Sequence, residues 1–428
     1  MKILALDIGT SSVKAAVLDT QTRQPVGTVV KTAYLLQQPD ADTATIDPEV
    51  LWSAISDAAR QAAAGQSVDG IGISCLTPCL VLLDHHQQPL FPFVTHLDRR
   101  ARPTAKALDT HYGTEFLRET GNRPLPGGIS AIYFHHWLQQ HPESASRVAH
   151  YLHLNSWICL KLTGETAMDP GNACFTGLCH WSEVRWSPEW CEHLGVKPVW
   201  LPNILPGNTT VGPLLPEWAK AWGLPAGIPV KLGLADTSSA ILAAGMEPGD
   251  LLHLVGTTQV LAVLTDAPQP SPVRLTRHLG VGESYLHVTH NPVGGVALDW
   301  LHQLCFNDVR VEDYYSTWID KALATSTSVT LEPLFLGGDR LEIDEKKAGF
   351  KNLSLTTDRV ELLAAVLHAM KLGHRHAWQS LARISPPKRI FLSGGGAAVV
   401  HKLLPEYQDA EVVEIDQASL LGVSRLFS

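Results

Sequence analysis

The same hairpin pattern occurs twice in this chain, once at its start and once in its second half. In residues 4–17 and again in residues 251–264, an apolar strand leads into a turn of glycine, threonine and a hydroxyl residue, and a second apolar strand follows. The matched turn residues are Gly9, Thr10 and Ser11 in the first copy and Gly256, Thr257 and Thr258 in the second. This repetition predicts two related halves that face each other across a cleft, with a phosphate-holding turn on each wall.

Both glycine turns join one strand to another strand. A P-loop or a dinucleotide fingerprint instead leads its glycine loop into a helix N-terminus, so neither motif fits. Further strands are predicted at 70–74, 80–84, 228–234 and 389–393, and helices at 48–64, 237–244 and 359–382. Strand and helix patterns that alternate in this way predict an α/β fold.

The length and composition indicate two ordinary globular domains. The chain has 428 residues, 45% of them hydrophobic and 18% charged, which exceeds one core and excludes extensive disorder. We place the boundary near residue 230, giving an N-terminal domain, 1–230, with an inserted segment at 120–225, and a C-terminal domain, 231–428. The insertion is rich in proline, tryptophan and glycine.

Charge and cysteine usage narrow the classes of partner. A net charge of −9 gives no basic surface for nucleic acid or an anionic membrane, and no apolar run approaches the roughly 18 residues that suggest a membrane-spanning helix. The start of the chain is unlike a signal peptide, and seven scattered cysteines suit a reducing compartment. We therefore expect a cytoplasmic protein whose partners are a small molecule and, at most, a second copy of the chain in a homodimer.

Two aspartates at predicted strand ends suit phosphoryl transfer, which needs donors around the phosphates, a divalent metal and a base. Asp7 precedes the first glycine turn and could orient the waters of a magnesium ion, although it could also simply brace its own turn. Asp236 ends a strand without a glycine turn, so it could accept a proton from an attacking hydroxyl or cap the following helix. The three glycines at 394–396 allow a ligand to approach the backbone closely.

The order of six motifs resembles the FGGY carbohydrate kinases, from residue 1 to about residue 425. The motifs span Asp7 to Lys14, Gly233 to Asp236, Gly256 to Thr258, Pro292 to Trp300, Pro333 to Arg340 and Gly394 to Ala397. The resemblance implies two actin-like, ribonuclease H-like ATPase domains that close over ATP, Mg²⁺ and a sugar. It implies Asp236 as the catalytic base, with Asp7 and Asp236 near the metal. The implied nucleotide contacts are the two glycine-threonine turns together with Gly295, Gly395, Gly396 and Ala397.

The implied sugar wall departs from the family pattern. Thr77 and Pro78 stand where xylulokinases have a Met-His pair, and because proline has no N–H group, plain xylulose is not expected to be the substrate. Asp98 and Arg100 keep the spacing of a family motif, which favours sugar contact over the alternative of a surface ion pair. Arg99 adds a charge that suggests an acidic substrate such as an aldonate.

These patterns together predict ATP-dependent phosphorylation of a hydroxyl on a ketose or polyol, with Asp236 as general base. One alternative is a kinase of a sugar acid. The other is a catalytically silent regulator that binds a sugar or nucleotide, which the altered sugar wall suggests and the presence of Asp7, Thr10, Asp236 and Thr257 opposes.

Overall fold

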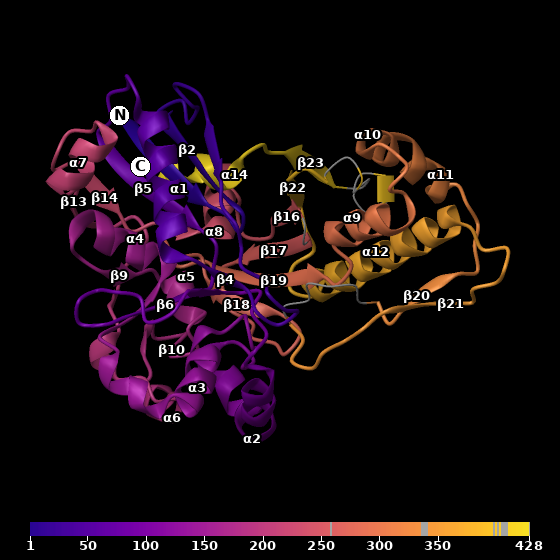
Figure 1. Ribbon diagram of the computed structural model, residues 1–428, viewed down its shortest axis with the longest axis horizontal. Helices are drawn as coiled ribbons and strands as arrows, with labels where there is room; N and C mark the ends of the chain where they lie inside the picture. Colours follow the sequence, from indigo (N-terminus) through magenta and orange to yellow (C-terminus); the bar gives the residue numbers. More distant parts are fainter. Residues whose placement is uncertain (257–258, 335–340, 397–398, 400–401, 404–409, 428) are drawn as a thin grey trace. The chain divides into compact units, whose positions relative to one another are not determined.

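The computed structural model describes residues 1–256, 259–334, 341–396, 399, 402–403 and 410–427 (Figure 1). The chain forms two compact units. Unit 1 contains Met1–Met246, Asp266–Leu286 and Gln417–Ser428, and unit 2 contains Glu247–Thr265 and His287–Asp416. Asp236 therefore belongs to unit 1. The domain boundary near residue 230 was expected from the repeated sequence pattern, and it stays a prediction.

Unit 1 is built on a seven-stranded sheet. Its path is β13-β14-β5-β1-β2-β3, and β15 also pairs with β5. The strands are β1 (Lys2–Ile8), β2 (Ser12–Asp19), β3 (Val30–Ala33), β5 (Gly70–Cys75), β13 (Thr210–Pro213), β14 (Pro229–Lys231) and β15 (Leu234–Ala235). The side chains of β1 from Ile3 to Ile8 are buried, because apolar layers cover the central strand on both faces.

The strand predicted at 228–234 is two strands, β14 and β15. Gly233 separates them with a φ of +84°, a left-handed conformation that side chains rarely adopt. Its N–H group donates to Gly207 O across 2.9 Å, and a Cβ at this position would collide with the carbonyl oxygen of Ile73. The chain turns at this glycine and then pairs with β5 again.

Three parallel strand ends meet at one edge of this sheet. β1 pairs with β5 so that Asp7 lies opposite Ser74, and β15 pairs with β5 so that Ala235 lies opposite Cys75. Since β1, β5 and β15 all run in the same direction, the residues that follow them emerge together. This edge therefore collects Asp7, Thr77 and Asp236.

The other elements of unit 1 surround this sheet. A second sheet has the order β4-β7-β6-β8, and two smaller two-stranded sheets, β10-β11 and β12-β9, complete the insertion. These strands are β4 (Thr45–Ile46), β6 (Cys79–Leu83), β7 (Phe93–Thr95), β8 (His150–His153), β9 (Ala167–Met168), β10 (Cys179–His180), β11 (Arg185–Trp186) and β12 (Asn203–Ile204). Unit 1 also includes β18 (Leu275–His278), which pairs in none of these sheets. The helices are α1 (Pro48–Ala63), α2 (Arg102–Thr120), α3 (Ser130–Gln140), α4 (Leu154–Thr163), α5 (Pro170–Cys174), α6 (Pro188–Leu194), α7 (Pro216–Trp222) and α8 (Asp236–Ala244).

The C-terminal segment of the chain packs against the centre of unit 1. It forms α14 (Ala418–Gly422) and a 3₁₀ helix, η5 (Val423–Phe427). A Cβ on Gly422 would collide with the carbonyl oxygen of Ser239 on α8, and one on Gly72 would collide with Val423. Glycine at these two positions allows the segment to lie directly on β5 and α8.

Unit 2 repeats the core pattern of unit 1. The β16–β17 hairpin (Leu251–Val255 and Gln259–Thr265) is antiparallel like β1–β2, and β22 (Arg389–Ser393) runs parallel to β16 as β5 does to β1. The remaining strands are β19 (Tyr285–Asn291), β20 (Thr330–Glu332), β21 (Gly349–Lys351) and β23 (Glu411–Glu414), and the helices are α9 (Gly295–Cys305), α10 (Val311–Asp313), α11 (Ile319–Leu323) and α12 (Arg359–Ala382). The sequence repeat is thus also a structural repeat.

The long helix α12 starts at a capping box formed by Asp358 and Glu361, as its sequence favours. Its buried residues, among them Leu363, Val366 and Met370, pack into the core of unit 2. No helix in the described part of the chain is both long and apolar enough to cross a membrane.

Candidate active site

Asp7 is a buried carboxylate held by two hydroxyl groups. Ser74 Oγ donates to Asp7 Oδ1 and Ser419 Oγ donates to Asp7 Oδ2, each across 2.9 Å. Burial raises the pKa of Asp7 to about 6, and the negative charge of Asp236 adds to this rise while the two hydroxyl bonds oppose it. The two aspartates therefore lie close enough to interact electrostatically.

Asp236 occupies the first residue of α8 and does not cap that helix. The N-cap residue is Ala235, and no side chain caps the helix. Asp236 Oδ1 accepts from the N–H group of Thr237 at 2.6 Å and from Thr237 Oγ1 at 3.1 Å, while Oδ2 makes no hydrogen bond within the described residues. The capping alternative is therefore wrong for this helix, and among the described residues one carboxylate oxygen of Asp236 has no hydrogen-bond partner.

The first glycine turn is held by its backbone. Gly9 N donates to Ser12 O across 3.0 Å, Tyr34 N donates to Ser11 O across 3.1 Å, and the Tyr34 hydroxyl donates to Gly9 O. Thr10 is half-buried, and its hydroxyl makes no hydrogen bond within the described residues. The turn thus has a fixed backbone, and within the described part of the chain the Thr10 hydroxyl is available to a ligand.

Thr77 lies just beyond the end of β5, and Pro78 follows it. The Thr77 side chain is buried, and its hydroxyl donates to Asn172 Oδ1 across 2.5 Å. The pairing of Ala235 with Cys75 sets Thr77 beside the start of α8. Of the predicted sugar-wall residues, this pair lies at the same sheet edge as Asp236.

Asp98 and Arg100 form an ion pair. Arg100 Nη2 lies 2.7 Å from Asp98 Oδ2, and the Arg100 backbone N–H donates to Asp98 Oδ1 across 3.1 Å. Asp98 is fully buried and also accepts from Ala44 N, whereas the Arg100 side chain is 34% exposed and lies over the Tyr133 ring. A direct contact of either residue with sugar stays a prediction; in this geometry Asp98 orients Arg100.

Arg99 does not extend towards a ligand. Its Nη1 group donates to the carbonyl oxygens of His96 at 2.8 Å and Asp98 at 3.0 Å, and the residue is buried. Its role is to hold this loop. The charge that suggested an acidic substrate is therefore used inside the protein.

Arg277 is a site residue that the sequence reasoning missed. It is one of the largest fully buried side chains, and its Nη1 group donates to Ser238 Oγ across 2.5 Å and to His278 O across 3.3 Å. Burial lowers its pKa, and Asp169 and Asp236 oppose that change through their charges. An arginine in the short, mostly polar strand β18 gives little signal, because only the fold brings it to α8.

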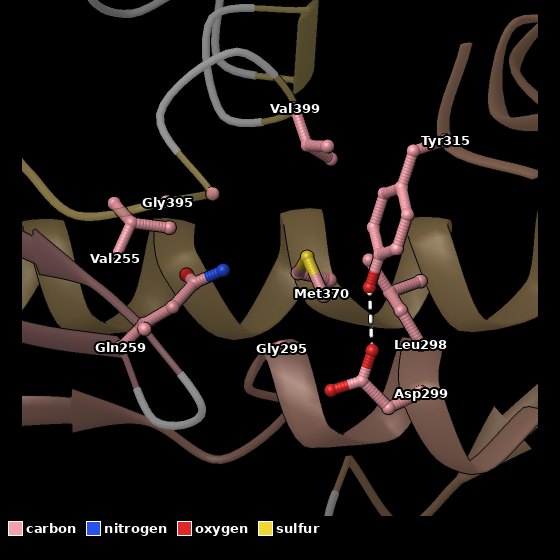
Figure 2. Close-up of a pocket in the computed structure, with 11 residues that line it drawn as sticks. Val255, Gln259, Gly295, Leu298, Asp299, Tyr315, Met370, Gly395 and Val399 are labelled. Carbon is pink, nitrogen blue, oxygen red and sulfur yellow. Dashed lines mark hydrogen bonds between the residues drawn. The ribbon is translucent and has the colours of Figure 1, made fainter. Parts of the chain in front are cut away.

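Unit 2 has a pocket of about 260 Å³ at the end of the second hairpin (Figure 2). The predicted residues that line it are Gly256, Gly295, Gly395 and Gly396; Thr257, Thr258 and Ala397 lie outside the described residues. The lining residues that sequence reasoning did not select are Val255, Gln259, Leu298, Asp299, Tyr315, Met370 and Val399. Asp299 and Leu298 fall within the motif from Pro292 to Trp300, which could have pointed to them.

The pocket combines an apolar wall with a few polar groups. Figure 2 shows Met370 and Leu298 on its floor and the Tyr315 hydroxyl donating to Asp299 Oδ1, across 2.7 Å. Gln259 Oε1 accepts from Asn291 Nδ2 across 2.9 Å, which fixes the Gln259 amide. A ligand with an apolar body and a few polar groups would suit this lining.

The glycine run lies directly on the hairpin. Gly394 has a φ of +115°, and a Cβ there would collide with the carbonyl oxygen of Val255. Gly396 N donates to that same oxygen across 3.2 Å. The glycines therefore approach the backbone of β16 closely. Gly395 and Gly396 also form one wall of the pocket.

The described residues contain no group of three or more histidine, cysteine or acidic side chains able to hold a metal. Mg²⁺ usually keeps several waters and is bound by one or two carboxylates together with substrate phosphates. Asp7 and Asp236 supply such a pair of carboxylates in unit 1. The residues present therefore fit a magnesium ion that arrives with a nucleotide.

Comparison with known proteins defines the class. The solved xylulose kinase of Rhodospirillum rubrum superposes with a TM-score of 0.86 at 25% identity, covering 99% of this chain and 88% of that one. The chain thus has the fold of two actin-like ATPase domains that the resemblance to the family implies, and this expectation of the fold class is confirmed.

Sequence comparison places the chain in its family. The profile of the FGGY family of carbohydrate kinases, N-terminal domain, matches residues 2–243. Xylulose kinase of Bacillus subtilis (strain 168) is 27% identical over 311 residues, 70% of this chain and 61% of that protein. Gluconokinase of the same strain is 23% identical over 451 residues, 98% of this chain and 86% of that protein. The chain belongs to the FGGY family and is a carbohydrate kinase, a class that uses ATP as co-substrate, generally with Mg²⁺.

Proposed function

We propose that this enzyme transfers the γ-phosphoryl group of ATP to a hydroxyl of a small sugar or polyol, with Asp236 as the general base. The observation that carries this proposal is the state of Asp236: its Oδ1 is engaged by Thr237, its Oδ2 has no partner in the described residues, and the buried Asp7 is nearby. A carboxylate oxygen left free in this way can accept the hydroxyl proton as the oxygen attacks phosphorus.

The neighbouring groups support a division of roles. Asp7 and Asp236 would hold Mg²⁺, which supplies charge neutralisation for the phosphates when bound. Thr10 offers a free hydroxyl to a phosphate oxygen, and Ser74 and Ser419 keep the Asp7 carboxylate in place. We assign the nucleotide base to the pocket lined by Gly295, Leu298 and Met370, and the second phosphate turn to Gly256, Thr257 and Thr258.

The Thr77 and Pro78 segment, at the same sheet edge as Asp236, supports a ketose or polyol as the substrate class. A ketose or polyol supplies the hydroxyl groups that such a segment can bind. The sugar-acid alternative loses its support from Arg99, whose guanidinium is bonded to backbone carbonyls. It keeps the support of the gluconokinase relative, so aldonates belong in any substrate screen.

A coupled assay of ADP release over a panel of ketoses, polyols and aldonates tests the proposal. We expect at least one ketose or polyol to be turned over with MgATP, and turnover to vanish with Asp236→Asn. Calorimetry of ATP and of each sugar accompanies the assay. Binding of both ligands without turnover by the wild-type protein would overturn the proposal in favour of a silent regulator, and turnover of aldonates alone would establish the sugar-acid alternative.

A further inference from the structure

A buried chain of polar side chains runs through unit 1 beneath Thr77. The Tyr151 hydroxyl lies 2.6 Å from Ser130 Oγ, Ser130 Oγ lies 2.8 Å from His153 Nε2, and His153 Nδ1 lies 3.0 Å from Asn172 Oδ1. Asn172 Nδ2 in turn donates to Asp169 Oδ1 across 2.6 Å. All five side chains are at least nine-tenths buried, so water does not compete for these bonds.

The Asp169 carboxylate fixes the orientation of the Asn172 amide. Asp169 Oδ2 accepts from the backbone N–H of Asn172 at 3.1 Å, and Oδ1 also accepts from Asn155 Nδ2 at 3.0 Å. If the Asn172 amide were reversed, its oxygen would face a carboxylate oxygen at 2.6 Å. The amide oxygen of Asn172 therefore points away from Asp169, towards His153 and Thr77.

The direction of every proton in the chain then follows. An amide oxygen can only accept, so His153 Nδ1 carries a hydrogen and donates to Asn172 Oδ1. Burial lowers the pKa of His153 to about 4, so the ring is neutral at neutral pH and its Nε2 is an acceptor. Ser130 must then donate to His153, and Tyr151 must donate to Ser130.

The same reasoning determines which atom receives the hydrogen bond from the Thr77 hydroxyl. Its hydroxyl lies 2.5 Å from Asn172 Oδ1 and must donate to it, because Asn172 Oδ1 carries no hydrogen. Only the lone pairs of Thr77 Oγ1 remain for a ligand, and Pro78 adds no N–H donor. The Thr77 side chain can therefore accept a hydrogen bond from a ligand but cannot donate one.

We propose that Asn172 is a positioning residue that makes Thr77 an acceptor of a substrate hydroxyl, so that the enzyme selects a hydroxyl and rejects a carbonyl or carboxylate oxygen at the carbon facing Thr77. The proposal rests on the proposed function, because Thr77 lies beside the base Asp236 at the sheet edge. It narrows the substrate class to compounds with a free hydroxyl at that carbon.

The proton directions can be measured without any substrate. Long-range ¹H–¹⁵N correlation NMR of the full-length protein, with His153→Gln for assignment, reports which ring nitrogen of His153 carries hydrogen. We expect the Nδ1–H form at pH 7, with Nε2 as the acceptor. An Nε2–H form or a charged ring would overturn the proposal, whether or not the protein is active.

The selectivity is measured on the compound that the ADP-release panel identifies, with its set of deoxyfluoro analogues. Fluorine accepts only weakly and cannot donate, so the analogue substituted at the carbon facing Thr77 should lose about 10-fold or more in kcat/KM with the wild-type enzyme. Thr77→Val should lower kcat/KM for the parent compound by a similar factor and leave little difference between parent and analogue. Thr77→Ser keeps the hydroxyl and should restore the difference.

Two further variants test whether the discrimination between parent and analogue depends on the Thr77–Asn172 hydrogen bond. Thr120→Val removes a buried hydroxyl that bonds to Phe116 O outside this network, and should leave the discrimination unchanged. Asn172→Ala frees the Thr77 proton and should raise relative activity on the fluorinated analogue. Equal loss on parent and analogue with Thr77→Val would overturn the acceptor assignment. A panel with no turnover would instead reject the proposed function and leave the tautomer measurement to decide the proton directions.

Discussion

Ser419 donates a hydrogen bond to Asp7 Oδ2 across 2.9 Å, although the two residues are 412 positions apart in the sequence. The carbonyl oxygen of Ser419 also accepts from Ser239 Oγ on α8, across 2.7 Å. One residue of the C-terminal segment therefore connects the Asp7 carboxylate to the helix that begins with Asp236. This link adds to the strand pairing that places both proposed metal-binding carboxylates within unit 1.

Replacing Asp236 with asparagine should abolish turnover and preserve the fold. The amide can still accept the Thr237 N–H bond, but it cannot take a proton at neutral pH, so kcat should fall by roughly 10²-fold or more. ADP release, a thermal melt and calorimetry of ATP check this prediction. Asp47→Asn, which changes the aspartate that caps α1, is the matched control and should keep normal kcat. Near-wild-type turnover of Asp236→Asn would rule out Asp236 as the base.

Asparagine at position 7 should stabilise the protein at neutral pH in magnesium-free buffer. Burial raises the pKa of Asp7 from 3.8 to about 6, so the folded state holds the proton more tightly than the unfolded state does. The free energy of unfolding therefore falls as the pH rises from about 4 to about 6, by at most roughly 3 kcal/mol. Urea unfolding of wild type and Asp7→Asn should show a difference that grows over this range and then stays constant.

The exposed Asp57→Asn variant is the control for this pH series and should track the wild type. Activity of Asp7→Asn should fall at the same time, because the amide is a poorer magnesium ligand than a carboxylate. A stability difference between wild type and Asp7→Asn that stays constant from pH 4 to pH 8 would contradict a raised pKa for the buried Asp7 carboxyl group.

Removing the charge of Arg277 should destabilise unit 1 through Asp169. Arg277→Met removes the buried positive charge that lowers the pKa of Asp169, together with the hydrogen bonds to Ser238 and His278, so the free energy of unfolding should fall. The same substitution should cost clearly less in an Asp169→Asn background, and urea unfolding of the four proteins measures this coupling. Arg60→Met, at an exposed pair with Asp57, should stay within about 0.5 kcal/mol. Additive effects of the two changes would show that the residues do not interact.

Filling the pocket of unit 2 should weaken nucleotide binding. Met370 lies on the pocket floor, so Met370→Trp occupies part of its 260 Å³ and should raise the Kd for ATP by about 10-fold or more. His368→Trp adds the same bulk at an exposed position of the same helix and should leave the Kd unchanged. Calorimetry with ATP checks both. Equal affinities for the wild type and Met370→Trp would place the nucleotide elsewhere.

Replacing Asp98 with asparagine should raise KM for the sugar and leave ATP affinity nearly unchanged. The substitution releases Arg100 from its ion pair and so disorders the predicted sugar wall. Steady-state kinetics on the substrate found in the panel measures KM, and calorimetry measures ATP binding. Asp109→Asn, which breaks a comparable pair with Arg123, is the control and should alter neither. Weaker ATP binding by Asp98→Asn would assign this residue to a different site.

The sequence alone predicted the elements that depend on local patterns. The two strands of the hairpin in residues 4–17 correspond to β1 and β2, and the helices at 48–64 and 359–382 correspond to α1 and α12, with outer ends that differ by two residues or fewer. Their apolar spacing and caps are local signals. The strand predicted at 228–234 was wrong because Gly233 takes a left-handed conformation that the apolar pattern conceals.

The sequence by itself determined the repeated hairpin, the α/β class and the two aspartates at strand ends, since each depends on residues that are close together in the chain. Only the tertiary structure decided which groups surround those aspartates. Ser419, Arg277 and Asn172 reach the site from segments 180, 39 and 95 positions away from the residues they bind there, namely Ser239, Ser238 and Thr77. Such contacts form only when the folded chain brings the parallel strand ends and the C-terminal helix α14 together. The local periodicity of the sequence carries no information about these contacts.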